Sequence, residues 1–257
     1  MKNRPVGASN FLYRIAHSDL FAFNLRSRDR WVAEQAGQIT RGKRVIDVGA
    51  GSAPYRALFS HCEYKTQDFA ALRPDQLRGG GYAQIDYVCD AKTIPVADAS
   101  FDVVLCTEVL EHHPEPAAVI CEFARILSMG GILLLTAPLG SGIHQEPNHY
   151  YGGYTPYWYR RFLPEAGFSE ISIEPNAGSF RHYAQESIRF MRMTAPFRSK
   201  LPFPVSLVWF PFWLLLAPLL MGLIPLAAKL LDRFDDEKRF TVGYHVRAVR
   251  RDERVES

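Results

Sequence analysis

The stretch that decides the fold is RVIDVGAGSAPYRALF, residues 44–59. Its apolar run carries an acid at Asp47, and two glycines, Gly49 and Gly51, follow with one residue between them. Pro54 then stands where a helix would begin, since proline fits the first turn of a helix. Because glycine lets a ligand approach the backbone closely, the stretch predicts a binding turn between a strand and a helix.

Strand-like and helix-like runs alternate along the chain around this turn. Such alternation, with several strands apolar on both faces, predicts a parallel sheet covered by helices on both sides. The predicted strands are residues 44–48, 63–67, 83–88, 101–106, 132–137, 168–174 and 240–250. The predicted helices are residues 10–38 (as one or two helices), 54–60, 116–127 and 156–166. Gly130–Gly131 is expected to end the helix at 116–127.

The glycine turn departs from the dinucleotide fingerprint G-x-G-x-x-G/A, because Pro54 occupies the third small position. A carboxylate at Asp47 would also be badly placed beside a pyrophosphate. It suits a ligand that carries positive charge, and S-adenosylmethionine has an ammonium group, a sulfonium and no phosphate. The turn therefore favours S-adenosylmethionine over a nicotinamide dinucleotide.

Two further acids follow predicted strands. Asp68 ends the second strand, where an acid in nucleotide-binding sheets accepts from the ribose hydroxyls. Asp90 follows the third strand and is a candidate acceptor for the adenine amino group. Each acid taken alone could be a loop cap or a solvated turn residue. Cofactor binding is favoured because the acids occupy corresponding places at the ends of the predicted strands.

The motifs VIDVGAGSAPY, QDFA, CDAKTIPVADASFDVVLCTEVLEH and ILSMGGILLLTAP occur in this order. Together they resemble the core of the class I S-adenosylmethionine-dependent methyltransferases, type 11-like family, over residues 44–137. YTPYWYRRFLPEAGF resembles the later segment that leads into the sixth strand. The resemblance implies a Rossmann-like α/β fold with a seven-stranded, mostly parallel sheet whose last strand is antiparallel.

The resemblance also implies a set of cofactor-binding residues. Asp47, Gly49 and Gly51 are expected at the methionine end of S-adenosyl-L-methionine, and Asp68 at its ribose. The adenine is expected beside Asp90 and Ala91, and the backbone of Thr107 beside the cofactor. Ala91 stands where the family carries a bulkier residue. The implied domains are an N-terminal helical segment at 1–43, a methyltransferase domain at 44–175 and 240–250, and a helical, partly hydrophobic insertion at 176–239.

Methyl transfer from a sulfonium needs alignment first, and a base only if the acceptor holds its proton tightly. The candidate catalytic residues are His149 and His112, with His149 slightly favoured because it lies in a glycine- and tyrosine-rich loop. His112 and His113 could instead only structure the loop before Pro114. His144, Glu146 and His149 match no metal-binding spacing, so no metal site is expected.

A second informative segment is LPFPVSLVWFPFWLLLAPLLMGLIPLAAKLLDRF, residues 201–234, which has no charged residue from Leu201 to Ala228. It is long enough for one membrane crossing and too short for two. Prolines recur in it every seven residues, which argues against a simple straight helix. A single crossing would also separate the last strand from the sheet.

We therefore expect a re-entrant or interfacial hairpin on the inner face of a membrane, with Trp209 and Trp213 at the lipid interface. The alternative is a hydrophobic subdomain packed on the sheet or in a dimer interface. The first 40 residues contain no uninterrupted apolar segment, so a cytoplasmic chain is expected, peripheral or monotopic on the membrane.

The sequence thus predicts a methyltransferase acting on a small-molecule or lipid-like acceptor: a lipid, a quinone, a lipid-linked saccharide or a soluble compound. A net charge of +3 is too small to predict a nucleic-acid partner. Two alternatives stay open: a module that binds S-adenosylmethionine without turnover and, less favoured, a nicotinamide oxidoreductase. The acceptor atom and the oligomeric state are not predicted.

Overall fold

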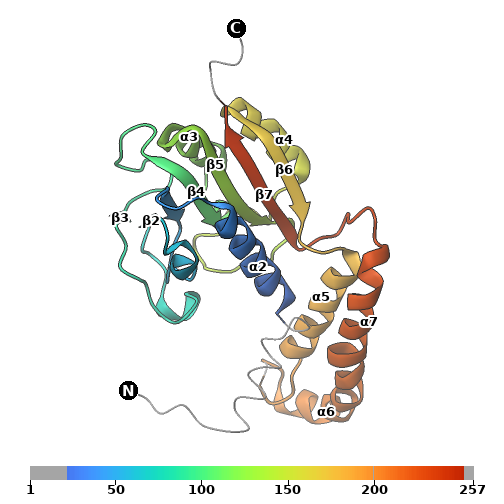
Figure 1. The fold of residues 1–257 in the computed structure, drawn as a ribbon. Helices are drawn as coiled ribbons and strands as arrows, with labels where there is room; N and C mark the ends of the chain where they lie inside the picture. The colour runs from blue at the N-terminus through green and yellow to red at the C-terminus, as the bar shows by residue number, and fades with distance from the viewer. Residues whose placement is uncertain (1–21, 199, 252–257) are drawn as a thin grey trace. The chain divides into compact units, whose positions relative to one another are not determined.

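The computed structural model describes residues 22–198 and 200–251, which divide into two compact units. Residues 28–175 and 243–251 contain all the strands of the described chain and are called the sheet unit. Residues 22–27 and 176–242 are mainly helical and are called the helical unit (Figure 1). Helix α2 (Phe23–Gln38) begins in the helical unit and continues into the sheet unit.

The sheet unit is built on a seven-stranded sheet of order β3-β2-β1-β4-β5-β7-β6. The strands are β1 (Arg44–Val48), β2 (Glu63–Asp68), β3 (Tyr87–Val88), β4 (Phe101–Thr107), β5 (Leu127–Pro138), β6 (Phe168–Pro175) and β7 (Gly243–Arg250). Strands β1 to β5 pair in parallel, and β7 runs antiparallel to both of its neighbours. The predicted fold class is confirmed.

Helices cover both faces of this sheet, as strands that are apolar on both sides require. On one face, Trp31 and Val32 of α2 pack on β1, β4 and β5. On the other face, α3 (Pro116–Ile126) and α4 (Pro156–Glu165) pack over the larger core (Figure 1). The strand order reverses between β1 and β4, and doubly wound sheets bind ligands at such a switch point.

The helix predicted at 54–60 is wrong. Only a single tight turn, Arg56–Phe59, forms there. Ala53 adopts a left-handed backbone with a φ of 49°, and Tyr55 and Phe59 are drawn into the core against α2. The glycine turn is therefore not followed by a helix N-terminus, so the partial positive charge that holds a pyrophosphate in dinucleotide sites is missing.

Two other local predictions are corrected. The strand at 83–88 shortens to β3, because the Asp86 carboxylate, and not a backbone carbonyl, accepts from the Thr66 N–H at 2.9 Å. Gly130–Gly131 does not cap α3, which ends at Ile126. The pair lies inside β5, where a Cβ on Gly131 would meet the Ser128 carbonyl oxygen at 2.7 Å.

The helical unit contains α5 (Ser179–Met193) and a second, longer helix. The longer helix is continuous over 32 residues, Phe203–Phe234, and is long and apolar enough to cross a membrane by length and composition alone. Its parts are α6 (Phe203–Pro218), a wide π-helical turn (Leu219–Leu223), α7 (Ile224–Leu231) and a final tight turn (Asp232–Phe234). The prolines thus make the helix irregular without ending it.

The two tryptophans of α6 face α5. The indole nitrogen of Trp209 donates to the Thr194 carbonyl, and that of Trp213 to the Met191 carbonyl, each at 2.9 Å. These carbonyls belong to the last turn of α5, which has no intrahelical donors for them. The polar edges of both indoles are thus bonded within the helical unit, and their predicted position at a lipid interface stays a prediction.

Candidate functional site

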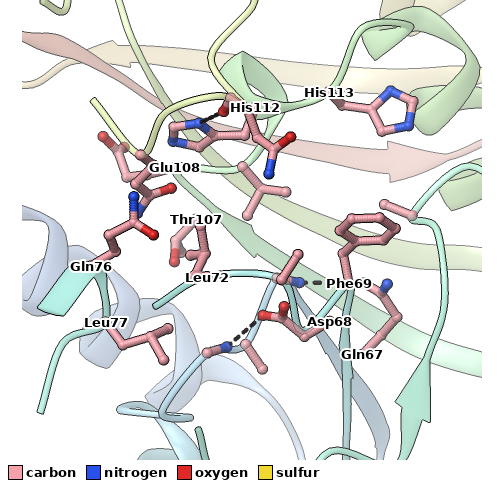
Figure 2. Close-up of a pocket in the computed structure, with 18 of the residues that line it drawn as sticks. Gln67, Asp68, Phe69, Leu72, Gln76, Leu77, Thr107, Glu108, His112 and His113 are labelled. Atoms are coloured by element: carbon pink, nitrogen blue, oxygen red, sulfur yellow. Dashed lines mark hydrogen bonds between the residues drawn. The ribbon is translucent and has the colours of Figure 1, made fainter. Parts of the chain in front are cut away.

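A cavity of about 530 Å³ opens beyond the carboxyl ends of β1, β2 and β4. Its size is in the usual range for small-molecule sites. All seven residues predicted to bind cofactor line it: Asp47, Gly49, Gly51, Asp68, Asp90, Ala91 and Thr107. Figure 2 shows how side chains from the strand ends converge on this space.

Gly49 and Gly51 bring bare backbone to the cavity wall. Both have left-handed backbones, with φ values of 69° and 54°. A Cβ on Gly49 would lie 2.2 Å from Cγ2 of Val109, so no larger residue fits there without moving the loop after β4. The turn is therefore glycine-dependent through both its conformation and its packing.

Asp47 lies at the floor of the cavity and is only 2% exposed. The pKa of its carboxyl is raised from 3.8 to about 7, mainly by burial and also by the negative charge of Asp68. A hydrogen bond from the Tyr64 hydroxyl and the charge of Arg56 partly oppose this rise. A cationic group in the cavity would relieve the cost of ionising Asp47.

Asp68 stabilises the turn from the neighbouring strand. Its carboxylate accepts from the backbone N–H groups of Gly51 and Ala70, each at 2.8 Å (Figure 2). The preceding residue, Gln67, is buried and links Gly49 to the carbonyl of Cys89. One strand end therefore holds the loops after β1 and β3 in place.

Phe69 is 64% exposed although it lines the cavity. It follows Asp68 directly, and both residues line the cavity. An exposed aromatic face in a cavity suits the stacking of a heterocyclic base.

Asp90 is oriented by two donors. It accepts from the backbone N–H of Lys92 at 2.9 Å and from Nε2 of His113 at 2.8 Å. Nδ1 of His113 accepts from the N–H of Glu115, so Nε2 carries the proton. Partial burial opposes ionisation of Asp90, but these hydrogen bonds lower its pKa overall. His113 thus contacts a predicted site residue.

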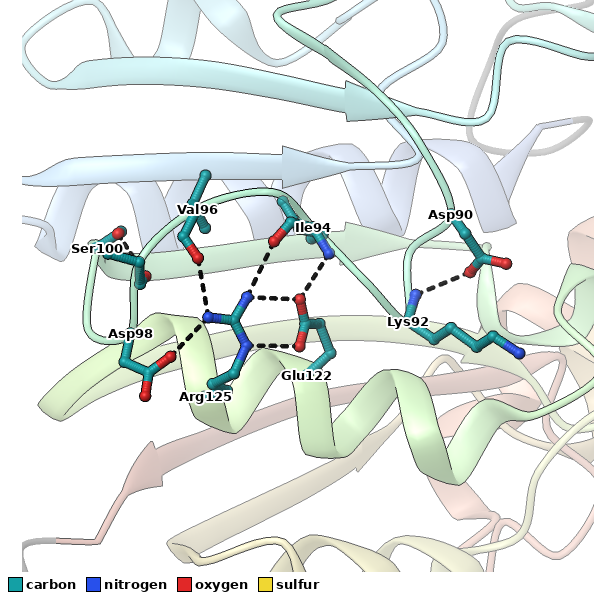
Figure 3. A network of polar contacts seen from close by, with 9 residues as sticks. Asp90, Lys92, Ile94, Val96, Asp98, Ser100, Glu122 and Arg125 are labelled. Atoms are coloured by element: carbon teal, nitrogen blue, oxygen red, sulfur yellow. Dashed lines mark hydrogen bonds and ion pairs between the residues drawn. The ribbon is translucent and has the colours of Figure 1, made fainter.

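The loop after Asp90 is fixed to α3 by Arg125 and Glu122 (Figure 3). Arg125 donates to the carbonyls of Ile94 and Val96 at 2.9 Å and forms a paired contact with Glu122 at 2.8 Å. Glu122 in turn accepts from the N–H of Ile94 at 2.6 Å. This network lies outside the cavity and holds one wall of it.

Arg28 of α2 reaches the cavity from the opposite side. Its Nη1 lies 3.5 Å from the Glu108 carboxylate, and its buried Nε has no hydrogen-bond partner among the described residues. Burial lowers the pKa of Arg28, but Glu108 and other neighbours outweigh this and raise it, so the guanidinium is charged. Its positive charge lines the side of the cavity that would suit an anionic group.

His112 lines the cavity, whereas His149 does not. Nδ1 of His112 lies 2.5 Å from the Asn148 carbonyl, which fixes the proton on Nδ1. The buried Nε2 lies 3.8 Å from the Glu111 carboxyl and has no hydrogen-bond partner in the described chain. Burial lowers the pKa of His112 to about 4, with the two neighbouring histidines adding to the effect. His112 is therefore a neutral imidazole with a free lone pair.

His149 contacts Ser141 through Nε2 at 3.1 Å, and its ring centre lies 5.6 Å from that of His112. His144 lies between them, 4.7 Å from each ring. Donor atoms of Glu111, His112 and His144 lie within 4.8 Å of one another. Burial, and then the charge of Glu108, raise the pKa of Glu111 well above its usual range.

A family model described as a methyltransferase domain matches residues 46–135, from β1 into β5. This segment is a methyltransferase domain. The predicted family is confirmed. S-adenosylmethionine, which the sequence motifs predict as the cofactor, is also the cofactor that the resemblance to this family implies.

Similar proteins agree with this placement. A ubiquinone biosynthesis O-methyltransferase of Pseudomonas aeruginosa (strain LESB58) is 34% identical over 133 residues, 48% of this chain and 53% of that protein. An uncharacterized methyltransferase of Mycobacterium sp. (strain KMS) is 33% identical over 136 residues, 49% of this chain and 52% of that protein. The chain therefore spans about half the length of the curated relatives it matches.

The fold of the methyltransferase domain also resembles a solved structure. A Haemonchus contortus phosphoethanolamine N-methyltransferase 2, in complex with phosphomonomethylethanolamine and S-adenosylhomocysteine, superposes with a TM-score of 0.51. It is 17% identical, and the match covers 97% of this chain and 61% of that chain. At this identity the likeness concerns the fold alone.

Sequence reasoning about the methyltransferase domain missed several cavity residues. Arg28 comes from a helix that carries no motif, and Glu108 owes its position to a left-handed backbone with a φ of 56°. Gln67 and Phe69, by contrast, flank the predicted Asp68 and could have been found from the strand end.

Proposed function

We propose that the chain is an S-adenosylmethionine-dependent methyltransferase that methylates an acceptor through the cavity at the β1/β4 switch point. The observation that carries the proposal is the set of three acids, Asp47, Asp68 and Asp90, on one cavity wall. They follow or end strands that lie side by side, and they match in order the parts of S-adenosylmethionine that can donate hydrogen bonds.

The charged side chains near the end of β1 fit the amino-acid part of S-adenosylmethionine. Asp47 would hold the ammonium group, and the free Nε of Arg28 would hold the carboxylate. Asp68 would accept from the ribose hydroxyls, with the ring of Phe69 beside the base. Asp90, kept ionised by His113 and Lys92, would accept from the adenine amino group.

When bound, the cofactor supplies an activated methyl group on a sulfonium. The protein contributes alignment of the acceptor and exclusion of water, and proximity alone is worth roughly 7–11 kcal/mol in favourable systems. His112 lines the same cavity and is neutral, so it can take a proton from an acceptor hydroxyl at Nε2. We therefore propose His112 as the base, and His149 as a neighbour that supports its loop.

The acceptor we favour is a lipid-like compound with an ionisable hydroxyl, such as a quinone precursor, a lipid or a lipid-linked saccharide. A named relative acts in ubiquinone biosynthesis, and a base is useful only for a hydroxyl or a carbon acid. The exposed apolar helix suits an enzyme that meets its acceptor at a membrane, on the cytoplasmic face. A soluble small-molecule acceptor is the second candidate.

The test is calorimetric titration of the wild type and Asp68→Ala with S-adenosylmethionine, NAD and NADP. We expect the wild type to bind S-adenosylmethionine alone and the variant to lose about 100-fold in affinity, because charge-assisted hydrogen bonds contribute about 1.5–3 kcal/mol each. Asp75→Ala, an exposed acid paired with Arg73, is the matched control and should bind normally.

Binding of a nicotinamide cofactor, or of none, would overturn the proposal. Turnover is then followed as S-adenosylhomocysteine released in the presence of a membrane extract. Binding without any such release would favour a module that holds the cofactor and lacks activity.

A further inference from the structure

The long helix of the helical unit exposes apolar side chains along its whole length. Representative residues from its beginning to its end are Phe203, Val208, Leu215, Leu223, Leu230 and Phe234, which are 58–75% exposed. No residue of its most apolar 18-residue window is buried. A helix on the surface of a water-soluble domain carries a polar outer face, so this helix has the composition of one surrounded by apolar material.

Only one stripe of this helix contacts protein. Ser206 and Ala228 are buried on that stripe, and the indoles of Trp209 and Trp213 bond α5 from it. Ser187 of α5 donates to the carbonyl of Leu220 on the same side, at 2.8 Å. From Phe203 to Ala228 the polar groups of the helix therefore face its partner helix and the outward face is apolar, whereas Lys229 and Arg233 near its end are exposed.

The path of the chain limits how this helix can meet a membrane. The strands that flank the helical unit, β6 and β7, are antiparallel neighbours, with Pro175 opposite Tyr244. The chain therefore leaves the sheet at one end of β6 and returns beside it. A single crossing between these strands would place β7 on the far side of the bilayer, which its pairing with β6 excludes.

The turn between α5 and α6 combines basic and aromatic residues. Arg192, Arg198 and Lys200 are exposed there, and among residues 22–198 and 200–251 none of them forms an ion pair. The ring of Phe197 lies 5.8 Å from those of Phe203 and Phe210. Basic side chains beside aromatic rings are the arrangement that meets anionic headgroups at a membrane surface.

The prolines also favour a shallow position. Pro211 and Pro218 are exposed and lie seven residues apart, on one side of the helix. Each lacks the N–H that would bond the carbonyl four residues earlier. Such carbonyls are costly in the hydrocarbon centre but can reach water near the headgroups.

We infer that the helical unit is a monotopic anchor for an anionic lipid bilayer. The helix at Phe203–Phe234 lies within one leaflet with its apolar face toward the acyl chains. The turn at 192–200 places its positive charges among the lipid phosphates. This inference stands independently of the catalytic activity proposed above.

The experiment is flotation of the full chain with vesicles of phosphatidylcholine, with or without 30% phosphatidylglycerol (about physiological anionic content). The wild type should float with both, and at least tenfold more tightly with the anionic vesicles, since each basic residue near the surface contributes about 1 kcal/mol. Val208→Glu/Leu215→Glu should lose at least tenfold in binding to both. Tyr157→Glu/Met129→Glu, on exposed residues of the sheet unit, is the matched control and should float like the wild type.

Two further measurements separate the parts of the inference. Arg192→Gln/Arg198→Gln/Lys200→Gln should abolish the preference for anionic vesicles and leave binding to neutral vesicles within threefold. Tryptophan introduced as Leu215→Trp should be quenched most by lipids brominated near the headgroup. Strongest quenching by bromine near the acyl ends would indicate a crossing and overturn the monotopic position.

A second copy of the chain is the competing occupant of the apolar face. Sedimentation velocity without lipid distinguishes it. A stable dimer that Val208→Glu/Leu215→Glu splits, with no flotation of the wild type, would overturn the membrane inference. Thermal melting and cofactor titration of each variant confirm that the sheet unit is folded, so a failed cofactor test leaves the flotation result interpretable.

Discussion

A buried carboxyl such as Asp47 costs the empty protein stability. Its pKa of about 7 means that the folded chain binds more protons than the unfolded chain between about pH 4 and 7. Stability from this group is therefore fully present at low pH and falls as the pH rises through 7. This loss of stability is expected for a carboxylate that is buried where a positively charged ligand would bind.

Replacing the acid makes this cost measurable. Asp47→Asn should be more stable than the wild type, and its advantage should grow by about 2 kcal/mol between pH 5.5 and 8.5, as the pKa difference requires. Urea denaturation at both pH values checks it. The same variant should bind S-adenosylmethionine weakly at both, whereas wild-type affinity should fall below pH 7 as the carboxyl is protonated. A pH-independent difference in stability would contradict the assignment.

The two candidate histidines can be separated by their rates. His112→Gln should lower kcat about 10²–10³-fold, because a positioned base contributes about this much. His149→Gln should change kcat less than tenfold, since that ring lies outside the cavity lining. The wild-type rate should show no loss of base between pH 5.5 and 8, because the pKa of His112 is about 4. Transfer of labelled methyl to a membrane extract is the measurement, and equal losses in both variants would contradict the choice.

Among single residues, the candidate site residues at strand ends could be predicted from the sequence. The periodicity of the strands and the order of the motifs place Asp47, Asp68 and Asp90 at the same edge of the sheet. The sequence could not rank His112 above His149. That ranking depends on the path of the loop between β5 and α4, which no periodic pattern encodes. Arg28 also could not be predicted. It lies 80 residues before Glu108 in the sequence, and only the packing of α2 brings the two side chains together.

At the scale of elements, the cavity wall after β3 depends on a cross-link rather than on regular structure. Residues 91–99 form no helix or strand, and they are held by Arg125 and Glu122 of α3 (Figure 3). The Glu122 side chain is 8% exposed and is paired with the guanidinium of Arg125. An irregular segment thereby acquires a fixed position next to Asp90.

Removing that guanidinium should loosen the wall. Arg125→Met should lower the free energy of unfolding by about 3 kcal/mol, since it leaves Glu122 buried without its partner and two carbonyls unbonded. It should also weaken S-adenosylmethionine binding through Asp90 and Ala91. Arg125→Lys keeps the charge but not the planar fork, so an intermediate loss is expected in urea denaturation. A loss below 1 kcal/mol in Arg125→Met would show that the loop is held by other contacts.

The helices and strands match their predicted bounds where the apolar runs of the sequence are long. They differ from the prediction where the backbone conformation of a single residue decides the structure. β1, β4 and α3 appear within one residue of their predicted ends, because their apolar patterns are strong. The segment after Pro54 had a helical start signal, but the left-handed Ala53 and the burial of Phe59 prevent a helix. Such local backbone choices follow from tertiary packing, which short-range patterns do not contain.

At the scale of the whole molecule, the helical unit is an excursion between two paired strands. Replacing residues 176–243 with Asn-Gly should join Pro175 to Tyr244 through a two-residue hairpin turn, which suits antiparallel neighbours. We expect this variant to bind S-adenosylmethionine within threefold of the wild type and to lose flotation with vesicles. Calorimetry and flotation on the same preparation check it. Loss of cofactor binding with a cooperative melt retained would show that the helical unit contributes to the site.

The position of β7 has a consequence for synthesis. β7 lies between β5 and β6 in the sheet, yet it follows both of them and the apolar helix in the chain. While a ribosome is still making residues 203–234, β6 has no neighbour to pair with and the sheet cannot close. The emerging chain therefore presents its most apolar segment before its core is complete, and it is at that moment, rather than after folding, that it is most exposed to capture by lipid or by chaperones.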